Sequence, residues 1–162
     1  MDNELYVKVL GRLQAQCSRK ECCSADIKTK ALKAMDGDED AAEQIVASLV
    51  SDRFVDDLRY ASAFAREKAS ISGWGAQKIR FMLMRKGIDR KTVDEALTEI
   101  DAASADRKLE SVIAVKYRTL KEDPQWRLKL IRFALGRGYG YDQVMSAVDR
   151  VSRGVMTDGF YF

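Results

Sequence analysis

Residues 51–97 read SDRFVDDLRYASAFAREKASISGWGAQKIRFMLMRKGIDRKTVDEAL, and this stretch decides the fold. Its apolar residues recur at helical spacing in three short segments, which predicts three amphipathic helices joined by tight turns. Gly73-Trp74-Gly75 separates the first two helices, and Gly87 ends the second. No helix of this length can bury its apolar stripe alone, so we expect the three to pack as one unit. The predicted inward positions are Ala61, Phe64, Ala65, Ala69, Ile79, Met82, Leu83, Val93, Ala96, Leu97 and Ile100.

Acidic residues stand where the helices of this stretch begin. Asp56 is placed to cap the first helix, and Asp89 is placed to cap the third. Asp56 and Asp57 are adjacent, and paired carboxylates are also a feature of acid–base catalysis. Their position at a helix start favours capping over catalysis.

The same pattern recurs at an offset of 51 residues. Ile79 falls on Leu130, and the turn glycine Gly87 falls on Gly138. The inward positions 93, 96, 97 and 100 fall on positions 144, 147, 148 and 151, which are all apolar. We therefore predict tandem three-helix repeats, an all-α chain of nine main helices that forms an elongated, curved array. The expected divisions are a degenerate first repeat over 1–50, repeats over 51–103 and 104–153, and a tail over 154–162.

The first repeat follows the pattern more loosely. Its first helix is expected over residues 5–16. Ser18 and Glu21 have the spacing of a capping box, which predicts that a second helix opens there and runs to about Met35. The tail ends in three aromatic residues, 160–162, which either dock on the last repeat or hang loose.

Composition excludes several classes of protein. The chain has 162 residues, of which 46% are hydrophobic and 33% charged, and it contains a single proline. This balance suits packed, amphipathic helices. No segment approaches the roughly 20 apolar residues of a membrane span, and the first residues lack a secretory pattern. We expect a cytoplasmic monomer.

The sequence offers few residues that could form a catalytic site. The chain contains no histidine, and Cys17, Cys22 and Cys23 cannot complete a zinc site without a fourth ligand. These cysteines are interpreted as buried or half-exposed structural thiols. The glycines at 136, 138 and 140 lack the Gly-Lys-Ser/Thr ending of a phosphate loop and follow a helix. We therefore expect no enzyme activity, no bound metal and no cofactor.

Basic residues suggest where an anionic partner would bind. Residues 1–52 carry a net charge of −3, residues 53–103 of +2 and residues 104–162 of +4. On the second helix of the middle repeat, Lys78 and Arg85 share one flank, with Phe81 close by. The offset maps Lys78 to Lys129 and Phe81 to Arg132. This set is either a partner-binding stripe or a solvated surface. Trp74, between two glycines, is either a binding hot spot or a plug between helices.

The middle stretch resembles the RecX family of bacterial regulators of the RecA recombinase. The resemblance continues through the Arg-Gly-aromatic and Tyr-Asp pattern of residues 137–142, weakens over residues 1–50 and is absent in the tail. It rests on the following residues: Phe54, Val55, Asp56, Asp57, Arg59, Tyr60, Ala61, Gly73, Trp74, Gly75, Ile79, Arg80, Leu83, Lys86, Gly87, Ile88, Glu95, Ala96 and Leu97.

This resemblance implies three-helix repeats and a protein that binds RecA and RecA–DNA filaments. It also implies inhibition of strand exchange, ATP hydrolysis and co-protease action in DNA repair and the SOS response, without a catalytic site or cofactor. Direct contact with DNA is left open. The alternative from the residues themselves is a helical DNA-binding module that acts without RecA, because tandem three-helix units also resemble helix-turn-helix domains.

Overall fold

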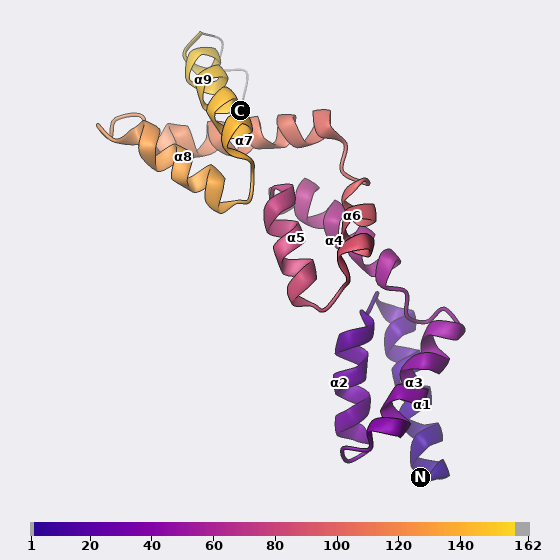
Figure 1. The fold of residues 1–162 in the computed structure, drawn as a ribbon. Helices are drawn as coiled ribbons and strands as arrows, with labels where there is room; N and C mark the ends of the chain where they lie inside the picture. The colour runs from indigo at the N-terminus through magenta and orange to yellow at the C-terminus, as the bar shows by residue number, and fades with distance from the viewer. Residues whose placement is uncertain (1, 158–162) are drawn as a thin grey trace. The chain divides into compact units, whose positions relative to one another are not determined.

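The computed structural model describes residues 2–157, and the three aromatic residues at 160–162 lie outside this range. Within it the chain forms nine α-helices and no strand, which confirms the all-α prediction (Figure 1). None of these helices combines the length and the apolar composition that a membrane span requires. The helices are α1 (Asn3–Arg19), α2 (Ser24–Ala34), α3 (Glu39–Ser51), α4 (Asp57–Ser70), α5 (Ala76–Arg85), α6 (Arg90–Leu97), α7 (Ala102–Leu120), α8 (Trp126–Gly136) and α9 (Tyr141–Thr157).

The chain divides into two compact units. The N-terminal unit comprises the residues up to Ala63 together with Leu83–Ala96. The C-terminal unit comprises Phe64–Met82 and the described chain from Leu97 onward. Helices α4 and α5 each begin in one unit and end in the other.

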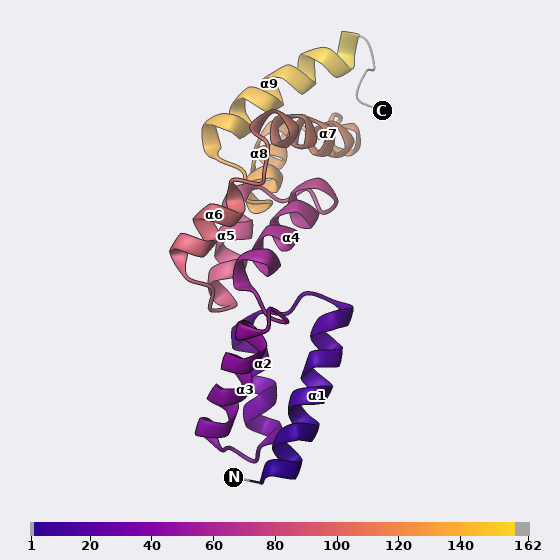
Figure 2. The same ribbon diagram turned by 90° about the vertical axis from the view of Figure 1, so that its right-hand side faces the viewer.

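The N-terminal unit is built on α1, α2 and α3, which lie side by side in both views (Figures 1 and 2). Ile27, Ile45 and Leu49 are completely buried between them. Each such side chain contributes about 1.5–3 kcal/mol through the removal of apolar surface from water. The three cysteines are buried free thiols in the same unit, as predicted. Burial raises the pKa of Cys17 to about 11, so its thiol stays protonated near neutral pH.

The predicted capping box at Ser18 and Glu21 is wrong. Helix α1 continues to Arg19, and the Ser18 hydroxyl donates to the carbonyl of Gln14, one turn back in the same helix. A serine whose hydroxyl is satisfied inside a helix cannot cap the next one. Helix α2 begins only at Ser24, and Glu21 lies between the two helices.

The predicted caps of the middle repeat are confirmed. The Asp56 carboxylate accepts a hydrogen bond from the amide of Arg59 at 3.0 Å. Asp89 accepts from the amide of Thr92 at 2.9 Å and also from its hydroxyl. These bonds lower the pKa of Asp89, because they stabilise its ionised form.

The C-terminal unit has its main core between α7, α8 and α9, around Leu109, Ile113, Leu130, Val144 and Val148. The 51-residue register predicted from sequence holds in the burial pattern. Ile79 and Leu130 are both fully buried, and so are the pairs 83 and 134, 93 and 144, and 96 and 147. Gly87 and Gly138 both have positive φ, at 82° and 96°. The repeats therefore share backbone conformation as well as apolar spacing.

Candidate interaction surface

The Gly73-Trp74-Gly75 turn joins α4 to α5 inside the C-terminal unit. Gly73 has a φ of 68°, a conformation that favours glycine. A Cβ at this position would lie 2.9 Å from Cγ2 of Val112 on α7. The turn is therefore fitted closely against the first helix of the last repeat.

Two glycines from successive repeats complete this contact through their main chains. The Gly75 N–H donates to the carbonyl of Arg137 at 2.8 Å, and the Gln77 N–H donates to the carbonyl of Gly138 at 3.1 Å. A Cβ on Gly75 would fall well inside 3.0 Å of the Gly138 carbonyl, and one on Gly138 would overlap Lys78. The two turns can approach this closely only because both positions lack side chains. We call this contact the glycine joint.

Trp74 is half-buried beside the glycine joint, with its ring edge-on to Phe64 at a centroid distance of 6.1 Å. Two ammonium groups approach the same indole: the Nζ atoms of Lys68 and Lys78 lie 4.9 and 4.3 Å from its centroid. The packing agrees with the interpretation of Trp74 as a plug between helices. Both lysines are held over the ring by cation–π attraction.

Phe133 on α8 makes a second contact of this kind. Lys116 Nζ and the Arg137 guanidinium each lie 5.1 Å from its ring centroid. The Arg137 guanidinium also donates to the carbonyl of Ser72 and so reaches across to the turn that precedes Trp74. Lys108 also lies close to this turn, because its Cε is 3.5 Å from the position that a Cβ on Gly73 would take.

The segment that places this turn also matches a protein-family model. Residues 56–97 match the model described as "RecX, second three-helix domain". A "Regulatory protein RecX" from Clostridium botulinum (strain Eklund 17B / Type B) is 33% identical over 115 residues, which are 68% of this chain and 53% of that protein. Another from Clostridium acetobutylicum is 28% identical over 149 residues, covering 88% of this chain and 67% of that protein.

This chain belongs to the RecX family. A solved structure, "Crystal structure of RecX from Lactobacillus salivarius", superposes with a TM-score of 0.83 and covers 93% of this chain and 99% of the other, at 20% identity. That likeness shows the shared fold. The chain spans about half the length of the first curated RecX relatives that it matches.

The RecX match begins at an acidic pair whose second member has a role that sequence reasoning missed. The Asp57 carboxylate accepts from both the amide of Ser24, at 2.7 Å, and its hydroxyl, at 2.6 Å. Ser24 begins α2, whose own N-cap residue, Cys23, makes no side-chain cap. Asp57 therefore caps a helix of the preceding repeat. Nothing within residues 51–97 indicates this partner.

Two ion pairs of the N-terminal unit accompany this long-range cap. Arg59 Nε lies 2.7 Å from a Glu21 carboxylate oxygen, and Lys86 Nζ lies 2.9 Å from an Asp26 oxygen. The hydrogen bond from Lys86 lowers the pKa of Asp26, and in turn raises that of Lys86. Residues of the RecX-matching segment thus contact α2 and the loop before it through charged side chains.

The residues predicted to bind a partner fall into different surroundings. Phe81 keeps 59% of its surface exposed, and Arg85 and Arg132 are also exposed. Lys129 pairs with Asp123 at 2.5 Å, so part of its charge is neutralised. Lys78 is half-buried against Trp74 and Gly138, and packing alone accounts for its position.

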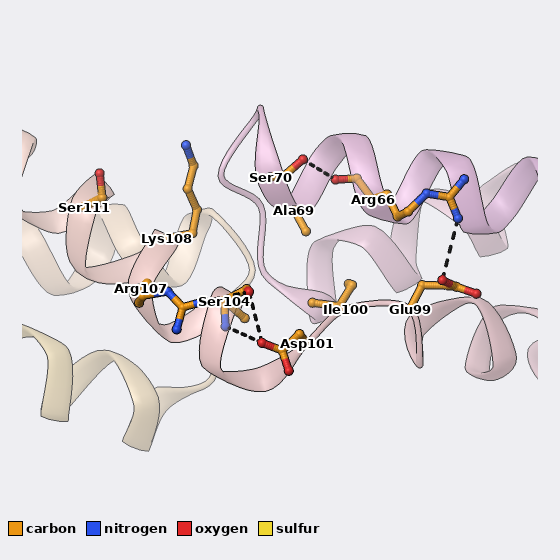
Figure 3. A pocket seen from close by; sticks show the side chains of 11 residues that line it. Arg66, Ala69, Ser70, Glu99, Ile100, Asp101, Ser104, Arg107, Lys108 and Ser111 are labelled. Carbon is orange, nitrogen blue, oxygen red and sulfur yellow. Dashed lines mark hydrogen bonds and ion pairs between the residues drawn. The ribbon is translucent and has the colours of Figure 1, made fainter.

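A hollow of about 520 Å³ lies between α4 and the start of α7 in the C-terminal unit (Figure 3). Its two carboxylates are engaged: Glu99 lies 3.7 Å from Arg66, and Asp101 accepts from the amide of Ser104 as the cap of α7. Its other walls carry serine hydroxyls and apolar atoms, and Lys108 stands at the end away from Glu99. Sequence reasoning named two of its lining residues, Ala69 and Ile100, as inward positions and singled out none of the polar ones.

Proposed function

We propose that this chain binds RecA and RecA–DNA filaments and lowers the recombinase, ATPase and co-protease activities of RecA. The observation that carries the proposal is the match of residues 56–97 to the second three-helix domain of RecX, extended by the Clostridium botulinum relative over 68% of the chain. The curated relatives are named regulatory proteins, and the resemblance set out above connects that regulation to RecA.

For the contact with RecA, we propose the exposed flank of α5 and the equivalent flank of α8. On α5 the flank presents Phe81 and Arg85, and on α8 it presents Lys129 and Arg132. An exposed aromatic side chain beside arginine is the composition that binding hot spots favour. The offset of 51 residues puts Phe81 and Arg132 at corresponding positions of the two helices, which favours a shared partner for these two positions.

The deciding experiment is a titration of RecA ATPase on single-stranded DNA with this protein. Steady-state hydrolysis should fall as the protein is added, while the protein alone should hydrolyse no ATP. Unchanged RecA hydrolysis at saturating protein would refute the proposal. Arg85→Glu, Lys129→Glu and Arg132→Glu combined should abolish inhibition with helicity intact, because exposed substitutions usually cost within about 0.5 kcal/mol each. Full inhibition by the folded triple variant would place the contact elsewhere.

The second candidate is a DNA-binding module that acts without RecA. The observation that favours it is the gathering of basic side chains around Trp74 and Phe133. Such a module should bind DNA alone, with an affinity that falls steeply with salt, and should leave RecA hydrolysis unchanged at salt concentrations that release it from DNA. A RecA regulator should still inhibit under those conditions.

A further inference from the structure

We infer that Cys17 and Cys22 form a redox-active thiol pair, which a small-molecule disulfide such as glutathione disulfide oxidises to an intramolecular disulfide. The pair lies in the N-terminal unit, where Cys17 belongs to the last turn of α1 and Cys22 to the loop between α1 and α2. The inference does not depend on the proposed function, because the flanks of α5 and α8 named there contain no cysteine.

The two thiols come together at the end of α1. Both cysteines belong to the same apolar core, and each keeps 6% of its surface exposed. The Gln16 side-chain amide, next to Cys17, donates to Cys22 Sγ at 4.0 Å, and that thiol donates to the Lys20 carbonyl at 3.7 Å. Burial, and after it the hydrogen bond with Cys22, raises the pKa of Cys17 to about 11. The fold therefore assembles the pair before any oxidant arrives.

Cys23 is the third thiol of this region, and it is not part of the pair. It lies outside the core cluster that holds Cys17 and Cys22. Burial raises its pKa, and its side-chain hydrogen bond is with Asp26 on α2. Adjacent residues such as Cys22 and Cys23 have Cα atoms about 3.8 Å apart, shorter than the span of about 4.4–6.8 Å that disulfides usually bridge. Geometry thus selects Cys17 as the partner of Cys22.

The loop can bring its sulfur to the helix. A disulfide requires the two sulfur atoms to approach to about 2.0 Å. Cys22 lies in the segment between α1 and α2, which leaves α1 with an extended residue, Lys20, at φ −154° and ψ 158°. The bond closes a ring that contains Glu21, whose carboxylate pairs with Arg59 at 2.7 Å. Oxidation therefore adds a covalent restraint beside the ion pair between this loop and α4.

The reaction consumes one glutathione disulfide and releases two glutathione thiols. The Cys22 thiolate attacks one sulfur of glutathione disulfide, which forms a mixed disulfide and expels a glutathione thiolate. The Cys17 sulfur then attacks the Cys22 sulfur, which forms the protein disulfide and expels the second glutathione thiolate. The two departing thiolates take up the two protons that the cysteines release. The protein loses two electrons, and glutathione disulfide gains them.

Burial slows this exchange but does not set its equilibrium. The attacking species is a thiolate, and a buried thiol stays protonated near neutral pH, so the reaction proceeds through local opening of the loop. The equilibrium depends on how strongly the fold holds the two thiols together, which acts as an effective concentration of one thiol for the other. The test therefore measures the equilibrium and not the rate.

The full chain is incubated in glutathione buffers of increasing disulfide-to-thiol ratio until reduced and oxidised starting samples give the same result. Acid stops the exchange, free thiols are alkylated in denaturant, and mass spectrometry of the intact chain and its peptides identifies each linkage. The same titration in concentrated urea is the matched reference, because there the two cysteines are only neighbours along a disordered chain.

We expect a disulfide between positions 17 and 22, with Cys23 alkylated. The folded chain should reach half-oxidation at a glutathione disulfide-to-thiol ratio at least about tenfold lower than the unfolded chain does, because the fold has already brought the thiols together. An equal or higher ratio for the folded chain, glutathione adducts without a protein disulfide, or a linkage to Cys23 would overturn the inference.

Two serine variants complete the test, with circular dichroism as the check on folding. Cys23→Ser is the matched control and should be oxidised at the same ratio as the parent. Cys22→Ser should form no protein disulfide at any ratio. A disulfide in folded Cys22→Ser, or its loss in folded Cys23→Ser, would contradict the pairing. Should either variant lose helicity, the comparison of the folded and unfolded parent still decides the inference.

Discussion

The Asp57 carboxylate binds both the amide and the hydroxyl of Ser24, 33 residues earlier in the chain, at 2.7 and 2.6 Å. The carboxylate thereby supplies the side-chain acceptor that Cys23 does not provide at the start of α2. A residue at the beginning of one repeat thus completes a helix of the repeat before it.

Removing this cap should be costly. Asp57→Ala should lower the free energy of unfolding by about 1–2 kcal/mol, the usual loss at an N-cap. Ser24→Ala should cost about 1 kcal/mol, because it removes the hydroxyl bond but keeps the amide. Urea unfolding of the two single variants and the double variant measures the coupling, which we expect near 1 kcal/mol. Additive losses would show that Asp57 stabilises α4 alone.

The ion pair between Lys86 and Asp26 should give a small dependence of stability on pH. The pKa of Asp26 is lowered, so its contribution is present above its ordinary value of 3.8 and is lost as pH falls through the lower folded value. The pKa of Lys86 is raised, so its contribution is present below its ordinary 10.5 and is lost as pH rises through the higher folded value.

Asp26→Asn should therefore lower the free energy of unfolding by less than about 1 kcal/mol at neutral pH, since both partners are partly exposed. The difference from the parent should vanish in strong acid, where Asp26 is protonated in both folded and unfolded chains. Lys86→Gln should show the same loss at neutral pH. Chemical unfolding over a pH series measures both, and a difference that persists in strong acid would contradict the electrostatic explanation.

The glycine joint should not tolerate a methyl group. Gly75→Ala forces its Cβ into the main chain of Gly138, and we expect a loss of about 1–3 kcal/mol, the range for overpacking. Gly136→Ala is the matched control, because a Cβ there meets nothing within 4 Å and Gly136 belongs to α8. The control should be neutral or slightly stabilising, by up to about 1 kcal/mol. Equal melting temperatures for the two variants would mean that the joint opens without cost.

Gly87 tests backbone strain without a crowded main chain. Its φ is 82°, and the nearest atom to an added Cβ is the Cβ of Ala25 at 3.3 Å. Gly87→Val should destabilise the chain by about 1–3 kcal/mol, because a β-branched residue at positive φ is strained. Gly87→Asn should cost less, since asparagine tolerates the left-handed region. Valine and asparagine variants of equal stability would argue against strain as the cause.

Local sequence signals predicted the helices, but they could not predict contacts between residues far apart in the chain. Asp56 and Asp89 cap helices that follow at once, and Gly87 and Gly138 end helices that precede them, so short spacings sufficed. The capping prediction at Ser18 was wrong because a serine hydroxyl can either cap the next helix or bond to a carbonyl of its own helix. In the structure it donates to the Gln14 carbonyl inside α1.

The partners of the candidate surface are set by tertiary approach. From sequence, Gly75 is predicted only to be a turn residue. The residue that leaves no room for a side chain there is Gly138, 63 positions later in the chain. Helical angles predicted a stripe that includes Lys78, and the flanking glycines drew attention to Trp74, over whose ring Lys78 lies. Neither signal could reveal Lys68, Lys108 or Lys116 near the same turn and the Phe133 ring. Helical periodicity assigns a residue to one face of its own helix and does not identify the segment opposite.

The glycine joint differs from the charged contacts of Asp57, Arg59 and Lys86 in which substitutions it can accept during evolution. A contact between charged side chains can drift during evolution by paired replacement, with the two partners changing charge or length together. Contacts between main chains offer no such exchange, because every amino acid brings the same carbonyl and, proline aside, the same amide. Among descendants of this sequence we therefore expect compensating changes at three pairs of positions: 24 and 57, 26 and 86, and 21 and 59. At positions 75 and 138 we expect glycine to be kept, because a lineage that acquires a side chain there has no compensating change available and is lost.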